Sequence, residues 1–558
     1  MKKLFLIPVL ALALAGCSND EAGVENSKKN VDINYMAINL VTTPSTRAAA
    51  DDASYEDGTT AENKVSAVRF YFFDASNNAV AVRDGKSYYD WDGAYNDGGK
   101  DAPNVEKIIS ATLVIETEKG HSVPKSIVAV LNPTSDLKET AINNVQALSD
   151  YVSESFKYVQ NQDFVMSNSV YAKGSTAVKA VSVEGHLYAT ADAAKNNPVN
   201  IYVERVLAKV NLKVDMATSG RANTYKTSTD SKYNYDGKEI YVEFLGWNTT
   251  ATTKKSRAMK EINPLWNEKL FGSVELWNYA PFFRSFWAMN PTLTWTGDYT
   301  YGPFDTASDA TAANAFTTFD GSVSTYVQEN ASGNYDSGAD TEHPTQVIIA
   351  ARLVDESGNA IEFANYAFTD MAVEDLPDAF AAASNVYIYE NVQGGKYTRI
   401  DGTYIDLKTA TEVGKADENT PGRYYVYAQL NETAAQGKTL VIGNAQGTTE
   451  GATKDDLNAE LLKVGRAKVW KGGNTYYYFD IAHLGANDVA ATAGKAGVVR
   501  NHVYKTVIKS LTGLGTPVFK PSETIYPEKP EDDEDTFIAA DIRILSWRIV
   551  NQDVNLAW

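Results

Sequence analysis

The stretch IYVERVLAKVNLKV, residues 201–214, decides the fold class of this chain. β-Branched and aliphatic residues dominate it, and neither glycine nor proline interrupts it, which is typical of a long buried strand. Similar runs recur between clusters of Gly, Asn, Asp and Pro, which favour turns. They cover residues 65–73, 125–131, 239–245, 346–353, 424–430, 475–481 and 502–508. The pattern predicts a mainly β protein.

Helical patterns are few. Residues 134–151 are predicted to contain one helix, and Thr453 is predicted to cap a second over residues 454–463. The length of 558 residues predicts more than one domain. Because a polar stretch follows the long strand, we expect two tandem antiparallel β-sandwich domains, residues 48–207 and 208–525, with helices as minor additions.

The composition excludes several classes of protein. A net charge of −20 argues against a nucleic-acid partner, which requires a basic face, and against electrostatic attachment to anionic lipid. Cys17 is the only cysteine, so no disulfide framework can form and stability depends on a large buried core. A thiolate metal site or a thiol nucleophile is likewise excluded from the mature chain.

No pattern of an active site or a metal site stands out. The five histidines lie far apart without HxxxH spacing, and GxSxG, P-loop and HExxH motifs are missing from the sequence. Residues 90–93 have some features of a calcium loop but lack its closing Glu. We therefore predict no catalytic residue, no metal ligand and no cofactor, and a protein that is not an enzyme.

The amino terminus has the features of a bacterial lipoprotein signal. Two lysines precede an apolar run over residues 4–15, and Cys17 follows two small residues. The apolar run is about half the length that a membrane-spanning helix needs, so we interpret residues 1–17 as a cleaved export segment. Cys17 is then the residue predicted to carry the lipid.

Residues 18–47 are interpreted as a propeptide that contains a strand. Over residues 31–43, Met36, Ile38 and Leu40 alternate with smaller or polar residues, which predicts a half-buried strand. Arg47 then precedes Ala48 in a loop of small residues, where a trypsin-like protease would cut. The alternative is that Arg47 is an ordinary loop arginine.

The carboxyl terminus has an apolar segment behind a polar linker. Residues 521–535, rich in Pro and acidic residues, cannot hold a core strand. Residues 526–558 are therefore interpreted as an acidic hinge followed by a β-prone tail. This tail is either the last strand of its own domain or a strand that pairs with an open sheet edge elsewhere. Its large apolar residues include Leu545, Trp547, Ile549, Val554 and Leu556.

Together these features resemble the fimbrillin family of the Bacteroidales, the shaft subunits of type V pili, and most closely the branch that builds short fimbriae. The resemblance covers most of the chain. Besides the lipid-attachment signal, it rests on YMAINL (35–40), STRAAA (45–50), VRFYFFD (68–74), FVMSN (164–168), VERVLAKV (203–210), VVRNHVYKTVIKSL (498–511) and DIRILSWRIVNQDVNL (541–556).

The resemblance implies transthyretin-like, Greek-key sandwiches and an assembly mechanism. The precursor would be lipidated on Cys17 and reach the outer membrane with residues 31–43 as a temporary strand. An arginine-specific surface protease would then cut between Arg47 and Ala48 and remove that strand. The tail of a neighbouring copy would fill the groove left behind, by β-augmentation. The candidate donor residues that fill it are Leu545, Trp547, Ile549, Val554 and Leu556. Repetition of this contact would produce a head-to-tail homopolymer.

The resemblance also implies partners and a location. The partners are further copies of the chain, accessory anchor and tip subunits, the protease, and surface ligands of host or bacterial cells. The location is a fimbrium that supports adhesion, biofilm formation and colonisation. Three alternatives stay open: a glycan-binding lipoprotein that keeps its lipid, a fimbrial anchor or tip subunit, and, more weakly supported, an exported glycoside hydrolase.

Overall fold

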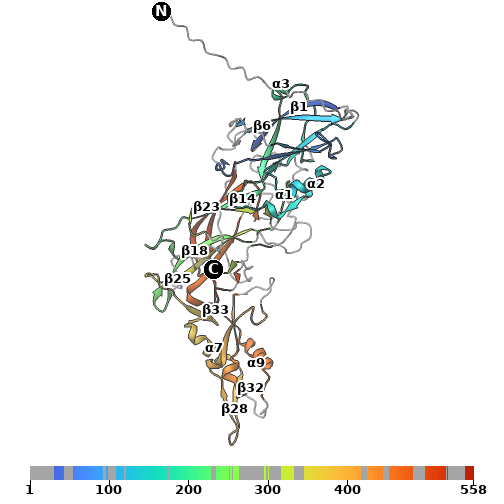
Figure 1. Ribbon diagram of the computed structural model, residues 1–558. Helices are drawn as coiled ribbons and strands as arrows, with labels where there is room; N and C mark the ends of the chain where they lie inside the picture. The colour runs from blue at the N-terminus through green and yellow to red at the C-terminus, as the bar shows by residue number, and fades with distance from the viewer. Residues whose placement is uncertain are drawn as a thin grey trace, which may run out of the picture.

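A computed structural model describes most of the chain, and its elements form an elongated molecule (Figure 1). The described residues are 31–42, 55–91, 96–97, 108–118, 121–173, 176–227, 234–250, 252–253, 255–262, 295–296, 299–300, 316–331, 345–415, 424–443, 451–481, 497–522, 524–525 and 547–557. Strands outnumber helices, as predicted, and the predicted mainly β fold is confirmed.

Most of the predicted elements form close to their predicted bounds. The predicted helical region contains α1 (Ser135–Glu139) and α2 (Val145–Asp150). Helix α9 (Lys454–Leu461) begins after Thr453, whose side chain and that of Asp456 form a capping box. The predicted strands appear as β3 (Val68–Phe73), β7 (Ser126–Leu131), β18 (Tyr241–Thr250), β25 (Gln346–Val354), β31 (Val426–Leu430), β34 (Asn474–Asp480) and β36 (His502–Thr512).

The predicted single strand over residues 201–214 is wrong in one respect. It is two strands, β13 (Val199–Arg205) and β14 (Leu207–Val214), which belong to different sheets. At the break, the Val206 backbone N–H donates to the Val165 carbonyl at 3.1 Å. Because Arg205, Val206 and Leu207 are all buried and none of them is Gly or Pro, the sequence shows no turn signal at the break.

The first sheet forms one end of the molecule, where Figure 1 labels β1 and β6. It has nine strands, with β12 (Val181–Ser182) paired to β7. Its apolar side chains form one hydrophobic cluster that extends from Met36 to Leu207 and includes Ala258 and Met259. The order along the sheet is β4 (Tyr88–Trp91), β3, β7, β9 (Met166–Asn168), β13, β1 (Val31–Thr42), β6 (Ile108–Glu118) and β5 (Asn96–Asp97).

Two five-stranded sheets form the middle of the molecule and share a second hydrophobic cluster, which begins at Ala208. One has the order β2 (Tyr55–Glu56), β39 (Trp547–Ala557), β36, β14 and β23 (Asp320–Gln328). The other has the order β15 (Thr224–Lys226), β18, β25, β34 and β37 (Thr516–Pro517). The first sheet and the sheet that contains β36 are mixed, because β1–β13, β14–β36 and β36–β39 are parallel pairs, whereas the sheet that contains β25 is antiparallel throughout.

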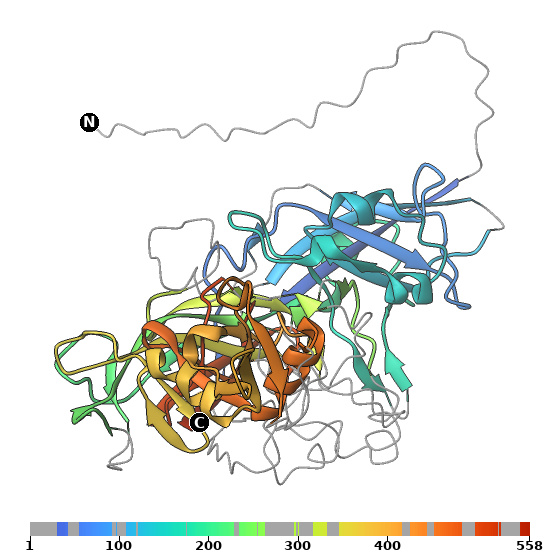
Figure 2. The same ribbon diagram turned by 90° about the horizontal axis from the view of Figure 1, so that it is seen from below.

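A third hydrophobic cluster lies between β25 and β34 in the sequence, at the opposite end from β1 (Figure 1). Figure 2 shows its gold and orange elements apart from the blue strands of the first sheet. Two sheets and the helices α7 (Leu376–Ala383) and α9 enclose it. The first sheet around this cluster has the order β27 (Thr369–Met371), β26 (Phe363–Tyr366), β33 (Arg466–Trp470), β31 and β30 (Ile405–Thr409). The other has the order β29 (Lys396–Arg399), β28 (Val386–Glu390) and β32 (Thr439–Ile442). The sequence did not distinguish this cluster from the second. The domain boundaries themselves stay predictions.

Candidate assembly interface

Strand β1, predicted to be a temporary strand, is an internal strand of the first sheet. It pairs antiparallel with β6 from Val31↔Glu118 to Val41↔Ile108. On its other side it pairs parallel with β13 from Ile38↔Val199 to Thr42↔Val203. Consequently β1 lies between two strands that the rest of the chain supplies, and both of their inner edges depend on it for hydrogen bonds.

The side chains of β1 alternate as the sequence predicted. Met36, Ile38 and Leu40 are completely buried in the first hydrophobic cluster. On the opposite face, Asn39 donates through Nδ2 to the Asn200 Oδ1 at 3.3 Å and accepts from the Ser110 Oγ at 2.7 Å. The strand therefore has one apolar face in the core and one polar face that bonds to its neighbours.

The predicted processing residues lie outside the described part of the chain. The processing residues are Cys17, Arg47 and Ala48, and the candidate donor Leu545 also lies outside the described residues. The described elements nevertheless bracket the predicted cut, because β1 ends at Thr42 and β2 begins at Tyr55.

The tail forms β39, which contains the candidate donors Trp547, Ile549, Val554 and Leu556. It pairs parallel with β36 from His502↔Arg548 to Thr512↔Ala557. It also pairs antiparallel with β2 through Tyr55↔Arg548 and Glu56↔Trp547. In this untrimmed single chain, the tail is therefore a strand of its own second region, which was one of the two interpretations left open by the sequence.

Two distant motifs, VERVLAKV and VVRNHVYKTVIKSL, meet where the first sheet joins the second region. The Arg205 backbone N–H and its Nη1 donate to the Asn501 Oδ1 at 3.2 and 3.1 Å. The Asn501 backbone N–H donates to the Leu207 carbonyl at 2.7 Å. The sequence suggested packing and edge-strand roles for the second motif, but β36 is an internal strand. Charged residues within both apolar runs were the signal that could have indicated this contact.

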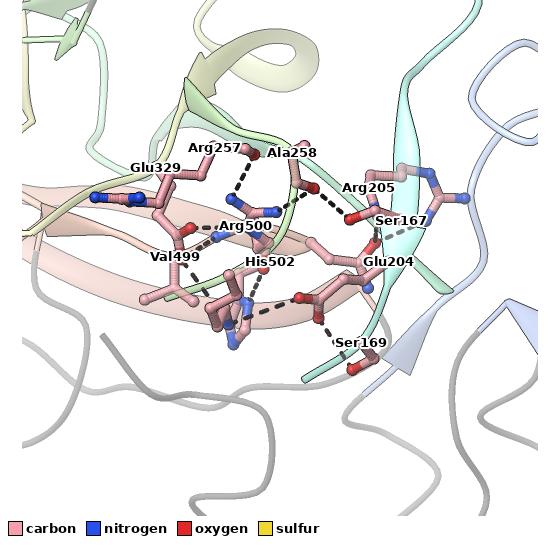
Figure 3. A network of polar contacts seen from close by, with 12 residues as sticks. Ser167, Ser169, Glu204, Arg205, Arg257, Ala258, Glu329, Val499, Arg500 and His502 are labelled. Atoms are coloured by element: carbon pink, nitrogen blue, oxygen red, sulfur yellow. Dashed lines mark hydrogen bonds and ion pairs between the residues drawn. The ribbon is translucent and has the colours of Figure 1, made fainter. Parts of the chain in front are cut away.

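Arg500 is at the centre of a buried polar network at this junction (Figure 3). It is 1% exposed, and its Nε donates to the Glu329 Oε2 at 2.7 Å. Its other nitrogens donate to the carbonyls of Arg257 and Ala258 at 3.0 and 3.4 Å. Since Arg257 and Ala258 are in a segment whose side chains reach the first hydrophobic cluster, Arg500 links the two regions.

Further charges lie beside Arg500. Lys260 Nζ is 3.8 Å from the Glu329 Oε1 and 4.0 Å from the Glu204 Oε1, and all three side chains are almost completely buried. The His502 Nδ1 is 2.7 Å from the Arg500 carbonyl. Buried charges are tolerated only when they are paired, so the junction has a specific geometry that depends on both regions.

The described residues contain no group of three His, Cys, Asp or Glu side chains arranged to hold a metal ion. Across the same residues, none of the helices combines the length and apolar character needed to cross a bilayer.

Two family models match the chain. The model for the major fimbrial subunit protein FimA matches residues 35–207. The model for the C-terminal region of fimbrillin, the major fimbrial subunit protein type IV, matches residues 468–553. None of the curated proteins compared with the chain matches it.

Solved structures similar to the chain include three fimbrial proteins. A fimbrillin from Porphyromonas gingivalis W83 is 12% identical, with 94% of this chain and 97% of that chain covered and a TM-score of 0.30. A fimbrial assembly protein from Parabacteroides distasonis ATCC 8503 is 11% identical, with 74% and 99% covered and a TM-score of 0.28. The C-terminally truncated tip fimbrial protein Mfa3 from P. gingivalis is 12% identical, with 66% and 100% covered and a TM-score of 0.26.

The two family models match opposite ends of the chain in the order that the sequence motifs predicted. The first covers most of β1 and continues through β13, and the second includes β36 and most of β39. Two separate segments of the chain therefore match models of fimbrial subunits, which confirms its resemblance to the fimbrillin family and supports a structural role in a cell-surface fimbria.

Proposed function

We propose that this chain is a shaft subunit that is exported as a lipoprotein with lipid on Cys17, cut after Arg47 and polymerised by strand exchange. The central position of β1 is the observation that supports this proposal most strongly. A cut between β1 and β2 would release a strand held by hydrogen bonds and packing alone, and would expose the inner edges of β6 and β13.

The groove that β1 occupies sets the requirements for a replacement strand. Met36, Ile38 and Leu40 contribute roughly 1.5–3 kcal/mol each through burial, and each ladder hydrogen bond adds about 0.5–1.5 kcal/mol net. A replacement must run in the direction of β1 to pair parallel with β13 and antiparallel with β6. Its length must be similar to that of β1, which has 12 residues, and β39 has 11.

The tail of a neighbouring copy is the proposed replacement. In the single chain, β39 has one long partner, β36, and one two-residue partner, β2. Exchange would require the tail to leave β36 and β2 and to enter the groove between β6, which pairs along most of β1, and β13, which pairs from Ile38 to Thr42. Because donor and groove lie on different parts of the molecule, the contact does not close on itself and a filament results.

Ile38→Ala is expected to destabilise the untrimmed chain by about 2–5 kcal/mol, because it removes a completely buried side chain from β1. The trimmed protein, which lacks β1, should unfold identically with and without the substitution. Ile33→Ala in the same strand is the matched control, since Ile33 is 56% exposed and should have little effect. Denaturant unfolding of both forms provides the measurement, and an equal effect of Ile38→Ala in both forms would exclude removal of β1.

Amino-terminal sequencing of the cell-surface protein is expected to give Ala48 as its first residue. Arg47→Ala should block the cut and leave the untrimmed chain outside the fibres, whereas Arg83→Ala, at an arginine in a folded turn, should change neither result. A surface protein that begins at lipidated Cys17 would instead support the anchor-subunit or glycan-binding alternative.

A polar cavity in the first region favours glycan binding as the second candidate function. Its volume is about 570 Å³, within the range of small-molecule sites. The buried Ser126 hydroxyl in its lining has no hydrogen-bond partner among the described residues. Lys179 in the lining is paired with Glu261, which favours a neutral, hydroxyl-rich ligand.

Under this glycan-binding alternative, Ser126→Val and Gln146→Ala should weaken the binding of neutral sugars in a calorimetric titration. If the unsubstituted chain binds no sugar, the alternative is excluded.

A further inference from the structure

We infer that the segment from Tyr55 to Asn63 is an anchor that keeps the trimmed amino terminus attached to the second region, with Glu62 as its positioning residue. The inference rests on the proposed cut after Arg47, because this segment is the first described part of the chain beyond it. The segment would otherwise be a free end once β1 had left.

Glu62 makes the central contacts of the anchor. It is 1% exposed, its Oε1 is 3.1 Å from the Lys209 Nζ, and the same oxygen accepts from the Tyr326 hydroxyl at 2.6 Å. Burial by itself would raise the pKa of Glu62, but the Tyr326 hydrogen bond and the Lys209 charge outweigh it and hold the pKa below its ordinary value. The side chain is therefore ionised and fixed between β14 and β23.

The backbone around Glu62 is shaped to present this side chain. The Thr59 backbone N–H donates to the Glu62 Oε2 at 2.6 Å, and the Glu62 backbone N–H donates to the Thr59 Oγ1 at 3.3 Å. This reciprocal pair closes a single turn, as a capping box does at the start of a helix. Both oxygens of the Glu62 carboxylate thus have partners: Oε2 accepts from the turn, and Oε1 contacts the second region.

Arg205 binds the same segment from the side of the first sheet. Its Nε donates to the Glu62 carbonyl at 3.1 Å, and its Nη2 donates to the Asn63 Oδ1. Since Arg205 also donates to Asn501, as described above, one guanidinium connects the segment to both motifs of the junction. This arrangement explains why a buried arginine lies at the point where the chain passes between the two regions.

Glu56 extends the anchor to the strand that holds the tail. Its carboxylate pairs with Lys505 and lies 3.5 Å from the Lys209 Nζ. Glu56 is also a residue of β2, whose backbone pairs with β39. The segment therefore stays fixed to β14 and β36 independently of the tail, because these ion pairs involve only side chains of those two strands.

Hydrogen exchange of the full chain, before and after trimming with an arginine-specific protease, tests the anchor. In both forms of the unsubstituted protein, amides of residues 55–63 should be protected. Glu62→Ala should accelerate their exchange by about tenfold to a hundredfold, because a buried charge-assisted hydrogen bond and an ion pair are lost. Glu62→Gln keeps an acceptor for Tyr326 with almost the same shape, and should give a smaller increase in a chain that folds.

Glu184→Gln is the matched control, since Glu184 is an exposed partner of Lys125 at 2.8 Å and should leave residues 55–63 unchanged. Unaltered exchange of this segment in folded Glu62→Ala and Glu62→Gln would overturn the inference, as would loss of protection when the unsubstituted chain is trimmed. If the protease does not cut after Arg47, the proposed function fails, whereas the measurement on the untrimmed chain still tests the role of Glu62.

Discussion

Truncation of the chain before Thr536 is expected to abolish fibre formation and to leave folded, trimmed monomers. The tail is the only candidate donor that the sequence offers, and a strand of its length contributes on the order of 10 kcal/mol gross to the junction between copies. Its loss should therefore prevent elongation completely. Electron microscopy of the cell surface and size-exclusion chromatography of the trimmed protein provide the measurement.

The truncated protein should still fold, because β36 retains its parallel pairing with β14 and its buried residues Val503, Tyr504 and Ile508. A matched control keeps the tail and replaces the polar residues Asn551 and Asn555 by Ala, which should leave fibres intact. Polymers of normal length from the truncated chain would contradict the donor assignment.

Arg500→Met is expected to destabilise the junction by about 3–5 kcal/mol, because it leaves the buried carboxylate of Glu329 without its closest cation. The carbonyls of Arg257 and Ala258 would lose the hydrogen bonds from Arg500 at the same time, although Ala258 would keep the one from the Ser167 hydroxyl. Differential scanning calorimetry of the untrimmed chain should show a lower transition temperature.

Arg83→Met is the control for this substitution. Arg83 is an exposed arginine 3.9 Å from Asp84, and exposed pairs contribute only about 0–1 kcal/mol. Equal transition temperatures for the two variants would show that the buried network does not stabilise the junction. If Arg500→Met lowers the transition temperature strongly but fibres still form normally, the buried network stabilises the subunit without being required for assembly.

The sequence predicted the strands because their signal is local. In β1, the alternation of Met36, Ile38 and Leu40 with other residues requires only that one face be buried, and the structure buries that face. The same holds for α9, since Thr453 and Asp456 are three residues apart and form a capping box without help from the rest of the fold.

The partners of each strand could not be predicted from the sequence. An alternating pattern shows that a strand has an apolar face, but not which strands lie beside it. Thus the pattern of β1 did not reveal its place between β6 and β13, and that of the tail was compatible with its own sheet or with another. The third hydrophobic cluster was hidden for the same reason, because the local pattern of its strands does not show that they pack around a separate core.

The sequence by itself determined a mainly β protein that resembles the fimbrillins, with an apolar strand near each end. The tertiary structure decided the break at Val206, the parallel pairs and the junction network. Arg205 and Asn501 are separated by 296 positions, and only the fold brings them within hydrogen-bond distance. The physical reason is that the apolar face of a strand can be recognised from the alternation of neighbouring residues, whereas a buried charge requires a partner that can come from any part of the chain.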